Sequence, residues 1–450
     1  MKRLYTQPSI KSLLITLFCF LFLNLTSTAY ADVAVQEMTT KKNICLLYVE
    51  DTTTDLTTVA FSFKGTGSAY DPIGKEGLAS MMTDLIFEQT KPGLDRRSII
   101  KRLKNIGVSG GINSGVDADN ITFSFKAPTE KLKEVFALLK EVMTHPAFDP
   151  KSLDKLKSFD PSASRLATAS ESEFASKIFI QKVFNGQAYS KPFFGTLDGR
   201  QSVTLKDLEE AHKAHFARES LIFSVVGSVS PKNLISYIDN TFGHLPAKTN
   251  LPQISAQKIQ SSGDITIVPK DTAQSGVVFG QPSLTRQDPN NLAMVVLNDI
   301  LGGKPFTSRL WAEVREKRGL VYNIQTDTLH WSNASLLSGQ FEAENQKVPE
   351  IIGLIKGTWK ELKEKGVTEE EFNSSKKGLL GSFALNFTSP EGIAQFLLAC
   401  KLAGLPKDYI NQRNRMLEMV KLEDVNRVAK QQLDPELLNF VVVGKLEANN

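Results

Sequence analysis

The feature that most constrains the fold of this chain is an internal repeat. Residues 205–227 and 422–444 align without a gap at a constant offset of 217, the separation of Leu205 from Leu422 and of Gly227 from Gly444. Each copy has the pattern of an amphipathic helix, a short connection and a buried β-branched strand that ends at glycine. A similar offset relates residues 132–143 to residues 348–362, both helical in pattern. The repeat therefore predicts two copies of one α+β unit.

Within the first copy, strands are predicted at residues 44–49, 57–63 and 120–126, and an amphipathic helix at 78–87. This order suits a mostly antiparallel sheet with long helices packed on one side. A stretch rich in Pro, Ser, Gln and Lys, residues 245–263, separates the copies. We take 248–263 as a linker between an N-terminal domain, residues 32–247, and a C-terminal domain, residues 264–450.

The first 31 residues have the pattern of a secretory signal peptide. Lys2, Arg3 and Lys11 precede or border an apolar run at residues 13–25, and an Ala-Tyr-Ala cleavage site ends at Ala31. The apolar run is too short for a good membrane span. We expect cleavage after Ala31 and a periplasmic or secreted protein without a membrane anchor.

The net charge bears on the kind of partner, and the cysteines bear on whether the chain is crosslinked. The net charge of +4 falls to +1 without the first 31 residues, which hold three cations and no acids. So balanced a surface gives no support for nucleic-acid binding. Cys45 and Cys400 remain after cleavage. Two separately buried thiols are favoured over a disulfide, because a chain of this size needs no crosslink to build a core, but both arrangements stay open.

Three separated motifs occur in one order along the chain. They are GSAYDPIGKEGLA at residues 67–79, AYSKPFFGT at residues 188–196, and GGKPFTSRLWAEVREKRGLVY at residues 302–322. Together with the duplication, they resemble the insulinase/pitrilysin zinc peptidases over essentially the whole mature chain. The resemblance implies the fold already predicted, with two homologous domains.

One departure from that family decides the expected activity. Active members carry H-x-x-E-H on the helix after Gly-Leu-Ala, where two His bind zinc and the Glu activates water. Here the same helical face holds Ser80, Thr83 and Asp84. The family's third ligand, a glutamate, would fall within residues 160–169, which contain none. We therefore expect no metal site and no peptidase activity in this chain alone.

The histidines offer no replacement for the missing ligands. None of the five forms H-x-x-E-H or H-E-x-x-H; they are His145, His212, His215, His244 and His330. His212 and His215 lie three apart on a predicted helix with Glu209 and Glu210 nearby. Such a pair most often belongs to a solvated helix face, and we disfavour a metal site there.

Arg315 and Tyr322 are the candidate substrate-binding residues. The pattern predicts a helix over residues 308–318, a C-terminal cap at Gly319, and a strand from Leu320 that includes Tyr322. Taken alone, the arginine would be a surface cation and the tyrosine a core residue. The resemblance implies another role, since the family places an arginine and a tyrosine at this spacing to hold the peptide backbone and stabilise the oxyanion.

Two functions follow from these observations. In the preferred one, the chain is the non-catalytic subunit of a heterodimeric zinc peptidase, and a homologous partner carries H-x-x-E-H and the zinc. The substrate is then a peptide, bound in extended form by adding a strand to a sheet edge. In the alternative, the chain is a catalytically dead peptide-binding or scaffold protein, as a monomer or a homodimer.

Overall fold

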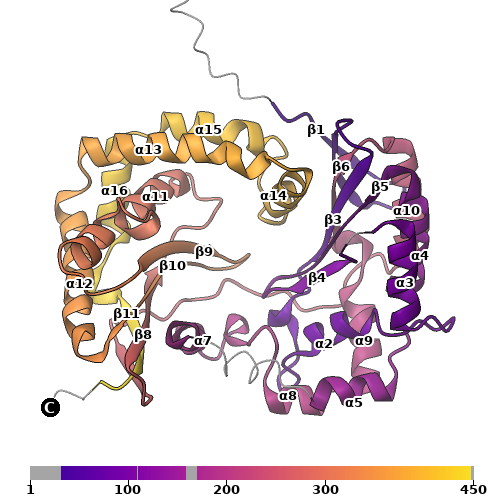
Figure 1. Cartoon of the computed structure of the whole chain (residues 1–450), viewed down its shortest axis with the longest axis horizontal. Coiled ribbons are helices and arrows are strands. Elements are labelled where there is room, and N and C mark those ends of the chain that lie inside the picture. The colour runs from indigo at the N-terminus through magenta and orange to yellow at the C-terminus, as the bar shows by residue number, and fades with distance from the viewer. Residues whose placement is uncertain (1–31, 109, 159–169, 447–450) are drawn as a thin grey trace, which may run out of the picture. The chain divides into compact units, whose positions relative to one another are not determined.

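Two β-sheets carry the fold, one built from each sequence repeat (Figure 1). The structure is a computed structural model that describes residues 32–108, 110–158 and 170–446. The first sheet has six strands in the order β1-β2-β6-β3-β5-β4. Its strands are β1 (Val35–Thr39), β2 (Cys45–Glu50), β3 (Leu56–Lys64), β4 (Asn113–Val116), β5 (Asn120–Pro128) and β6 (Leu221–Gly227).

The second sheet has five strands in the order β7-β11-β8-β10-β9. Its strands are β7 (Ile265–Pro269), β8 (Gln274–Pro282), β9 (Ile324–His330), β10 (Ser335–Glu344) and β11 (Asn439–Gly444). Each sheet has one parallel pair, β2 with β6 and β7 with β11, and its other neighbours are antiparallel. The predicted α+β class with mostly antiparallel sheets is confirmed.

The repeat is also visible in where elements begin and end. The helix α9 (Leu205–His215) and the helix α16 (Leu422–Gln432) have matching bounds at the offset of the sequence repeat, and β6 and β11 end at the equivalent glycines. The other helices are α2 (Leu78–Leu85), α3 (Arg96–Ile106), α4 (Leu132–Thr144), α5 (Pro150–Ser158), α7 (Glu171–Val183), α8 (Leu197–Ser202), α10 (Pro231–Phe242), α11 (Asn291–Asn298), α12 (Val348–Lys365), α13 (Glu369–Phe383), α14 (Pro390–Leu402) and α15 (Tyr409–Met419).

One face of each sheet packs against helices from its own half and forms the main core. In the first sheet, the ring of Phe61 lies 5.1 Å from that of Phe123 and 4.9 Å from that of Phe223, centroid to centroid. Figure 1 shows α3, α4 and α10 along this sheet. In the second sheet, Phe279 lies 5.8 Å from Trp359 of α12. Fully buried aromatic rings contribute most to such cores because each removes a large apolar area from water.

The second face of each sheet is covered by a helix from the other half of the sequence. Helix α14 packs across β3 and β6 of the first sheet, and Lys126 of β5 pairs with Glu391 of α14 at 2.6 Å. Helix α7 packs across β8 and β11 of the second sheet, where a Cβ on Gly280 would lie 3.2 Å from the Phe179 ring. The two halves have therefore exchanged one helix each.

The two exchanged helices cover faces of different chemistry. Thr58, Ser62 and Ser224 are buried on the α14 side of the first sheet, opposite the phenylalanines of the main core. Under α7, the second sheet instead presents apolar side chains, including Val278 and Val441, to Phe179. The first interface mixes hydroxyl groups with apolar side chains such as Ile222 and Val226, and the second is apolar.

The predicted linker contains no helix or strand, since α10 ends at Phe242 and β7 begins at Ile265. It is nevertheless tied to neighbouring elements. The Gln257 side chain accepts a hydrogen bond from the backbone N–H of Ala188 at 2.8 Å, and its backbone N–H donates to the Asn333 carbonyl at 2.9 Å. Its conformation is thus held by specific bonds.

Candidate functional site

The helix expected to carry zinc in this fold is present as α2. It begins after Gly77, whose φ of 104° lies in the left-handed region, and it ends at Leu85, close to the predicted end. Its apolar stripe is buried, with Met81 and Met82 at 0% exposure. The predicted helix is therefore confirmed.

The N-terminus of α2 is held by residues of two sequence motifs, at 67–79 and 188–196. The Asp71 carboxylate accepts hydrogen bonds from the N–H of Gly77 at 2.7 Å and of Ala79 at 2.9 Å, which caps the helix. Burial raises the pKa of Asp71 to about 7, and the two N–H donors and Lys191 oppose that shift. A Cβ on Gly195 would lie 2.0 Å from the Glu76 carbonyl oxygen, so two backbones meet here without space for a side chain.

The ligand face of α2 does not fit zinc. Ser80 and Thr83 are only 5% and 2% exposed, and the Thr83 hydroxyl donates to the Ala79 carbonyl one turn back at 2.8 Å. Burial raises the pKa of Asp84, against the lowering effect of Arg200 and Arg96. Two neutral hydroxyls and one carboxyl do not replace two imidazoles and a glutamate. Residues 160–169, where the third ligand was expected, lie outside the described residues.

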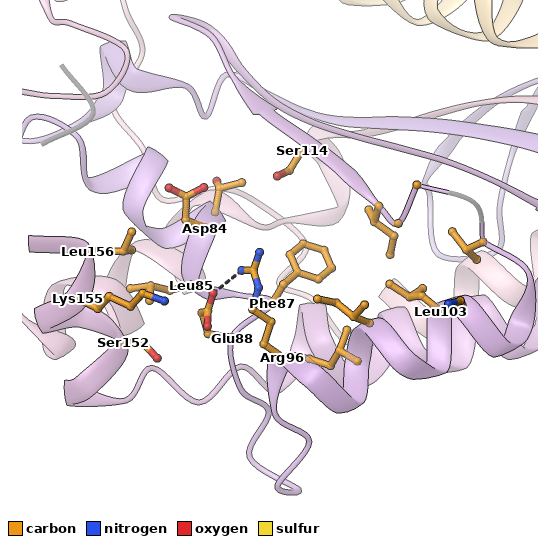
Figure 2. Close-up of a pocket in the computed structure, with 18 of the residues that line it drawn as sticks. Asp84, Leu85, Phe87, Glu88, Arg96, Leu103, Ser114, Ser152, Lys155 and Leu156 are labelled. Carbon is orange, nitrogen blue, oxygen red and sulfur yellow. Dashed lines mark hydrogen bonds and ion pairs between the residues drawn. The ribbon is translucent and has the colours of Figure 1, made fainter. Parts of the chain in front are cut away.

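A groove of about 1340 Å³ opens beside this face of α2 (Figure 2). Asp84 of α2 and Ser114 of β4 both line this groove, and Figure 2 shows Arg96 paired with Glu88. The rest of the lining is largely apolar and includes Leu85, Phe87, Ile99, Ile100, Leu103, Val108, Ile112 and Leu156. An open groove with a mainly apolar wall therefore lies where the resemblance to active peptidases would put the zinc site.

Both histidines of α9 have a backbone carbonyl as hydrogen-bond partner. His212 Nε2 lies 2.8 Å from the Met143 carbonyl, and His215 Nδ1 lies 2.8 Å from the Ala211 carbonyl. The prediction of a solvated face was wrong for His215, which is 2% exposed because it shares the buried stripe of α9 with Leu208 and Ala211. Burial lowers the pKa of His215 to about 4. Among the described residues, no group of three His, Cys, Asp or Glu side chains could hold a metal ion.

Arg315 and Tyr322 are brought together by the structure. Arg315 lies on the π-helical turn η6 (Trp311–Glu316), and its Cζ atom is 5.5 Å from the centroid of the Tyr322 ring. The Tyr322 side chain is 85% exposed. A guanidinium over an aromatic face is held by a cation–π attraction that leaves its N–H groups able to donate to a ligand.

The predicted start of the strand after Gly319 was wrong. The strand β9 begins at Ile324 and not at Leu320, so Tyr322 is an exposed residue of the preceding loop. The reason lies at Gly319, whose φ of 63° ends the helix while the N–H of Leu320 bonds to the Val314 carbonyl at 3.0 Å. This closure turns the chain, so pairing with β10 starts only at Ile324 opposite Phe341.

The other cations of this helix have carboxylate partners. Arg318 pairs with Glu313 at 2.8 Å, and Lys317 contacts the same carboxylate. Arg309 binds Glu371 of α13 with both ends of its guanidinium, at 2.7 and 2.8 Å. Arg315 therefore differs from its neighbours in facing a tyrosine ring.

A pocket of about 450 Å³ adjoins the arginine–tyrosine pair, by which we mean Arg315 and Tyr322. Its other lining residues are Ser170, Ser172, Gln274, Gly319, Leu320, Val321, Asn323, Gln340, Phe341, Glu342, Ala343 and Glu344. Ser172 donates to Glu342 at 2.8 Å, which fixes one wall. A guanidinium and a phenol at the mouth of such a pocket can both donate hydrogen bonds to a peptide carbonyl.

Sequence patterns did not single out the exposed aromatic residue Phe306, which lies just before the same helix. Its ring centroid is 4.7 Å from that of Trp311. No periodicity marks a single aromatic residue in a loop, so only the backbone geometry reveals it.

Among the residues that the structure describes, Cys45 and Cys400 are free thiols. Cys400 is buried in α14, and burial raises its pKa to about 12. Cys45 is half-buried, and burial raises its pKa against the opposing effect of Lys401. Across residues 32–108, 110–158 and 170–446, no helix is both long and apolar enough to cross a membrane; the predicted signal peptide lies outside these residues.

Comparison with known proteins matches two family descriptions to consecutive parts of the chain. Residues 46–196 match "Insulinase (Peptidase family M16)", and residues 202–379 match "Peptidase M16 inactive domain". A "non-peptidase homolog YmxG" of Helicobacter pylori is 25% identical over 435 residues, 96% of this chain and 98% of that protein. An "uncharacterized zinc protease YmxG" of Bacillus subtilis is 24% identical over 82% of this chain and 88% of its own length.

Solved structures show the same fold. A peptidase M16 inactive domain from Pseudomonas fluorescens superposes with a TM-score of 0.85 at 22% identity, covering 92% of this chain and 99% of its own. A protease from Helicobacter pylori gives a TM-score of 0.80 at 19% identity, covering 92% of this chain and all of its own. With the emptied ligand face of α2 and two consecutive family matches, the chain belongs to the insulinase (M16) peptidase family as a catalytically inactive member.

Proposed function

We propose that this chain is the non-catalytic subunit of a two-subunit zinc peptidase. It supplies hydrogen-bond donors from Arg315 and Tyr322 to a bound peptide, while a homologous partner carries the zinc helix. The zinc belongs to that partner, because the donor set on α2 of this chain does not fit it.

The observation that carries this proposal is the unequal fate of the two halves of the site. On α2 the zinc-binding side chains are replaced, since Ser80 and Thr83 are buried, Thr83 is bonded to its own helix, and only Asp84 of that face is exposed to the groove. In the second half, Arg315 lies over a Tyr322 side chain that is 85% exposed. Two exposed hydrogen-bond donors beside a pocket suit a chain that binds a peptide. Because α2 lacks the zinc ligands, hydrolysis of that peptide requires a zinc site in another chain.

Strand addition gives the peptide a second point of contact. In the first sheet β4 is an edge strand that pairs only with β5, and its Ser114 lines the groove beside α2. In the second sheet the edge strand β9 is less accessible, because Asn298 donates to the Thr326 carbonyl at 3.4 Å and Asp327 accepts from the Thr328 N–H at 2.7 Å. An extended peptide is therefore better placed on β4.

We further propose a periplasmic or secreted location. The signal-peptide pattern that ends at Ala31 supports it. Amino-terminal sequencing of the protein purified from its native host tests this, with Asp32 expected as the first residue.

The function is tested by purifying the chain alone and together with its copurifying homologue, then measuring hydrolysis of an unstructured peptide. We expect activity and zinc only in the assembled pair. Arg315→Ala or Tyr322→Phe in this chain should lower turnover by about 10²-fold, as loss of one oxyanion donor does. Arg318→Ala is the matched control, since its guanidinium is paired with Glu313 on the same helix, and it should leave turnover unchanged.

Two results contradict the proposal. One is peptide hydrolysis by this chain alone that a chelator abolishes. The other is an assembled pair whose turnover is insensitive to both Arg315→Ala and Tyr322→Phe.

A catalytically dead peptide-binding or scaffold protein, monomeric or homodimeric, is the second candidate. The groove of about 1340 Å³ beside α2 favours it, because a mainly apolar groove can hold a peptide without any chemistry. In that case a peptide binds the isolated chain, no zinc-bearing homologue copurifies, and Asp84→Lys or Ile100→Asp in the groove wall abolishes binding.

A further inference from the structure

Phe306 combines two unusual properties. Among the described residues, only Asn43 and Phe306 have a positive φ without being glycine, and the φ of Phe306 is 68°. Its side chain is also 71% exposed. A bulky side chain in the left-handed region is a strained arrangement, and such strain concentrates at ligand-binding positions held in place by their surroundings.

What holds Phe306 in place is Trp311. The two ring centroids are 4.7 Å apart with planes inclined at 59°, and Trp311 is only 8% exposed. The N–H of Ser308 donates to the Lys304 carbonyl at 3.2 Å, which closes the loop around Phe306. The exposed ring of Phe306 thus packs on the buried ring of Trp311.

This aromatic pair continues into the arginine–tyrosine pair. Trp311 and Arg315 both lie on η6 and are four residues apart, a separation that puts side chains on the same helical face. Arg315 in turn lies over Tyr322. The two pairs are therefore linked through one short helical segment. An extended peptide rises about 3.3 Å per residue, so one bound strand of a few residues can meet both pairs.

We propose that Phe306 is a specificity-determining residue. It receives an apolar side chain of the bound peptide near the carbonyl that Arg315 and Tyr322 hold. This inference rests on the proposed peptide-binding role of that pair. In an extended peptide, successive side chains alternate between two faces, so a fixed carbonyl contact determines which side chain faces the Phe306 ring. Edge-to-face or offset contact between two aromatic rings adds to the burial of their apolar surface.

The test measures direct peptide binding to the full chain, alone and in the assembled pair, by fluorescence anisotropy. The probes are two labelled, blocked nine-residue peptides of alanine, serine and threonine, with phenylalanine or serine at the central position. We expect the phenylalanine peptide to bind about tenfold more tightly, the size of preference an apolar contact supplies. Phe306→Ala should reduce that preference below about twofold, and Phe306→Tyr should keep it.

Other variants separate this inference from the proposed function. Arg315→Ala and Tyr322→Phe should weaken both peptides by a common factor and keep the preference. Leu385→Ala is the matched control, since Leu385 is also 71% exposed but lies on η8 (Ala384–Phe387), and it should change neither affinity. Circular dichroism of Phe306→Ala and of the milder Phe306→Leu checks that the fold is retained.

Each remaining outcome overturns the inference. An unchanged preference in Phe306→Ala refutes it, while weakening by Arg315→Ala leaves the proposed function standing. An equal loss for both peptides in Phe306→Ala shows that Phe306 builds the site without selecting the peptide. Loss of copurification with the homologous partner, with the preference unchanged, identifies Phe306 as a subunit contact. Absence of binding to either peptide refutes the inference and the proposed function together.

Discussion

The contact between Gly195 and the N-terminus of α2 allows a sharp test of how the inactive site is still built. Gly195 has a φ of 77°, and a Cβ placed on it would lie 2.0 Å from the Glu76 carbonyl oxygen and 2.5 Å from the Gly77 Cα. Gly186 has a φ of 73° with nothing within 4 Å of the equivalent Cβ. The two glycines therefore have similar left-handed φ angles, in which an alanine would be strained, and differ in the space available for its Cβ.

Substituting alanine at Gly186 and at Gly195 separates the cost of a left-handed alanine backbone from the cost of steric overlap. Placing a Cβ in the left-handed region costs about 1–2 kcal/mol, and the reduced entropy of the unfolded chain returns about 0.4–1 kcal/mol. We therefore expect Gly186→Ala to lower the free energy of unfolding by about 1 kcal/mol. Gly195→Ala must also displace backbone, and we expect a loss above about 4 kcal/mol, a size that requires a specific structural cause.

Urea unfolding followed by circular dichroism measures both variants against the native chain. Comparable slopes of the unfolding free energy against urea allow the two losses to be compared directly. If Gly195→Ala is no more destabilising than Gly186→Ala, the close approach of residues 76–77 and 195 is wrong, and with it our account of how α2 is positioned.

Three further predictions test other parts of the structure. Phe179→Ala, which removes a ring 1% exposed under the second sheet, should lower the free energy of unfolding by about 3–5 kcal/mol in the same urea assay; a loss below 1 kcal/mol would show that α7 does not pack there. Because burial raises the pKa of Asp71 to about 7 from 3.8, the folded state holds this proton more tightly than the unfolded state. That stabilisation is complete below pH 4 and is lost as pH rises to 7, by at most about 4 kcal/mol, so unfolding measured against pH should show a smaller decline in Asp71→Asn than in the native chain. Cys400, buried and with its pKa raised to about 12, should react with a thiol reagent at pH 8 only after denaturation, and rapid labelling of the native chain at Cys400 would contradict its placement.

The repeated elements could be predicted because their signals are local. The helices α9 and α16 and the strands β6 and β11 have unbroken periodicity that ends at glycine, and the structure keeps these bounds. The emptied face of α2 was predictable for the same reason, since side chains three and four apart on a helix must share a face.

Other features depend on contacts that the sequence does not encode locally. The late start of β9 follows from backbone closure at Gly319, where alternation in the sequence had suggested a strand from Leu320. The burial of His215 depends on what packs against α9, and helical periodicity alone did not exclude a solvated face. The exposed, strained Phe306 follows no periodic pattern at all.

The exchange of α7 and α14 between the halves has a consequence for the order in which the chain folds. Helix α7 precedes the second sheet in the sequence, so its apolar surface is available as soon as that sheet forms. Helix α14 follows the first sheet, and residues 228–389 must emerge before it does, a delay on the order of ten to thirty seconds during synthesis. Throughout that delay the uncovered face presents hydroxyl groups such as those of Thr58, Ser62 and Ser224, which water can solvate. The half that must wait for its cover thus exposes a face on which hydroxyl groups interrupt the apolar side chains, so that water can solvate part of it during the delay.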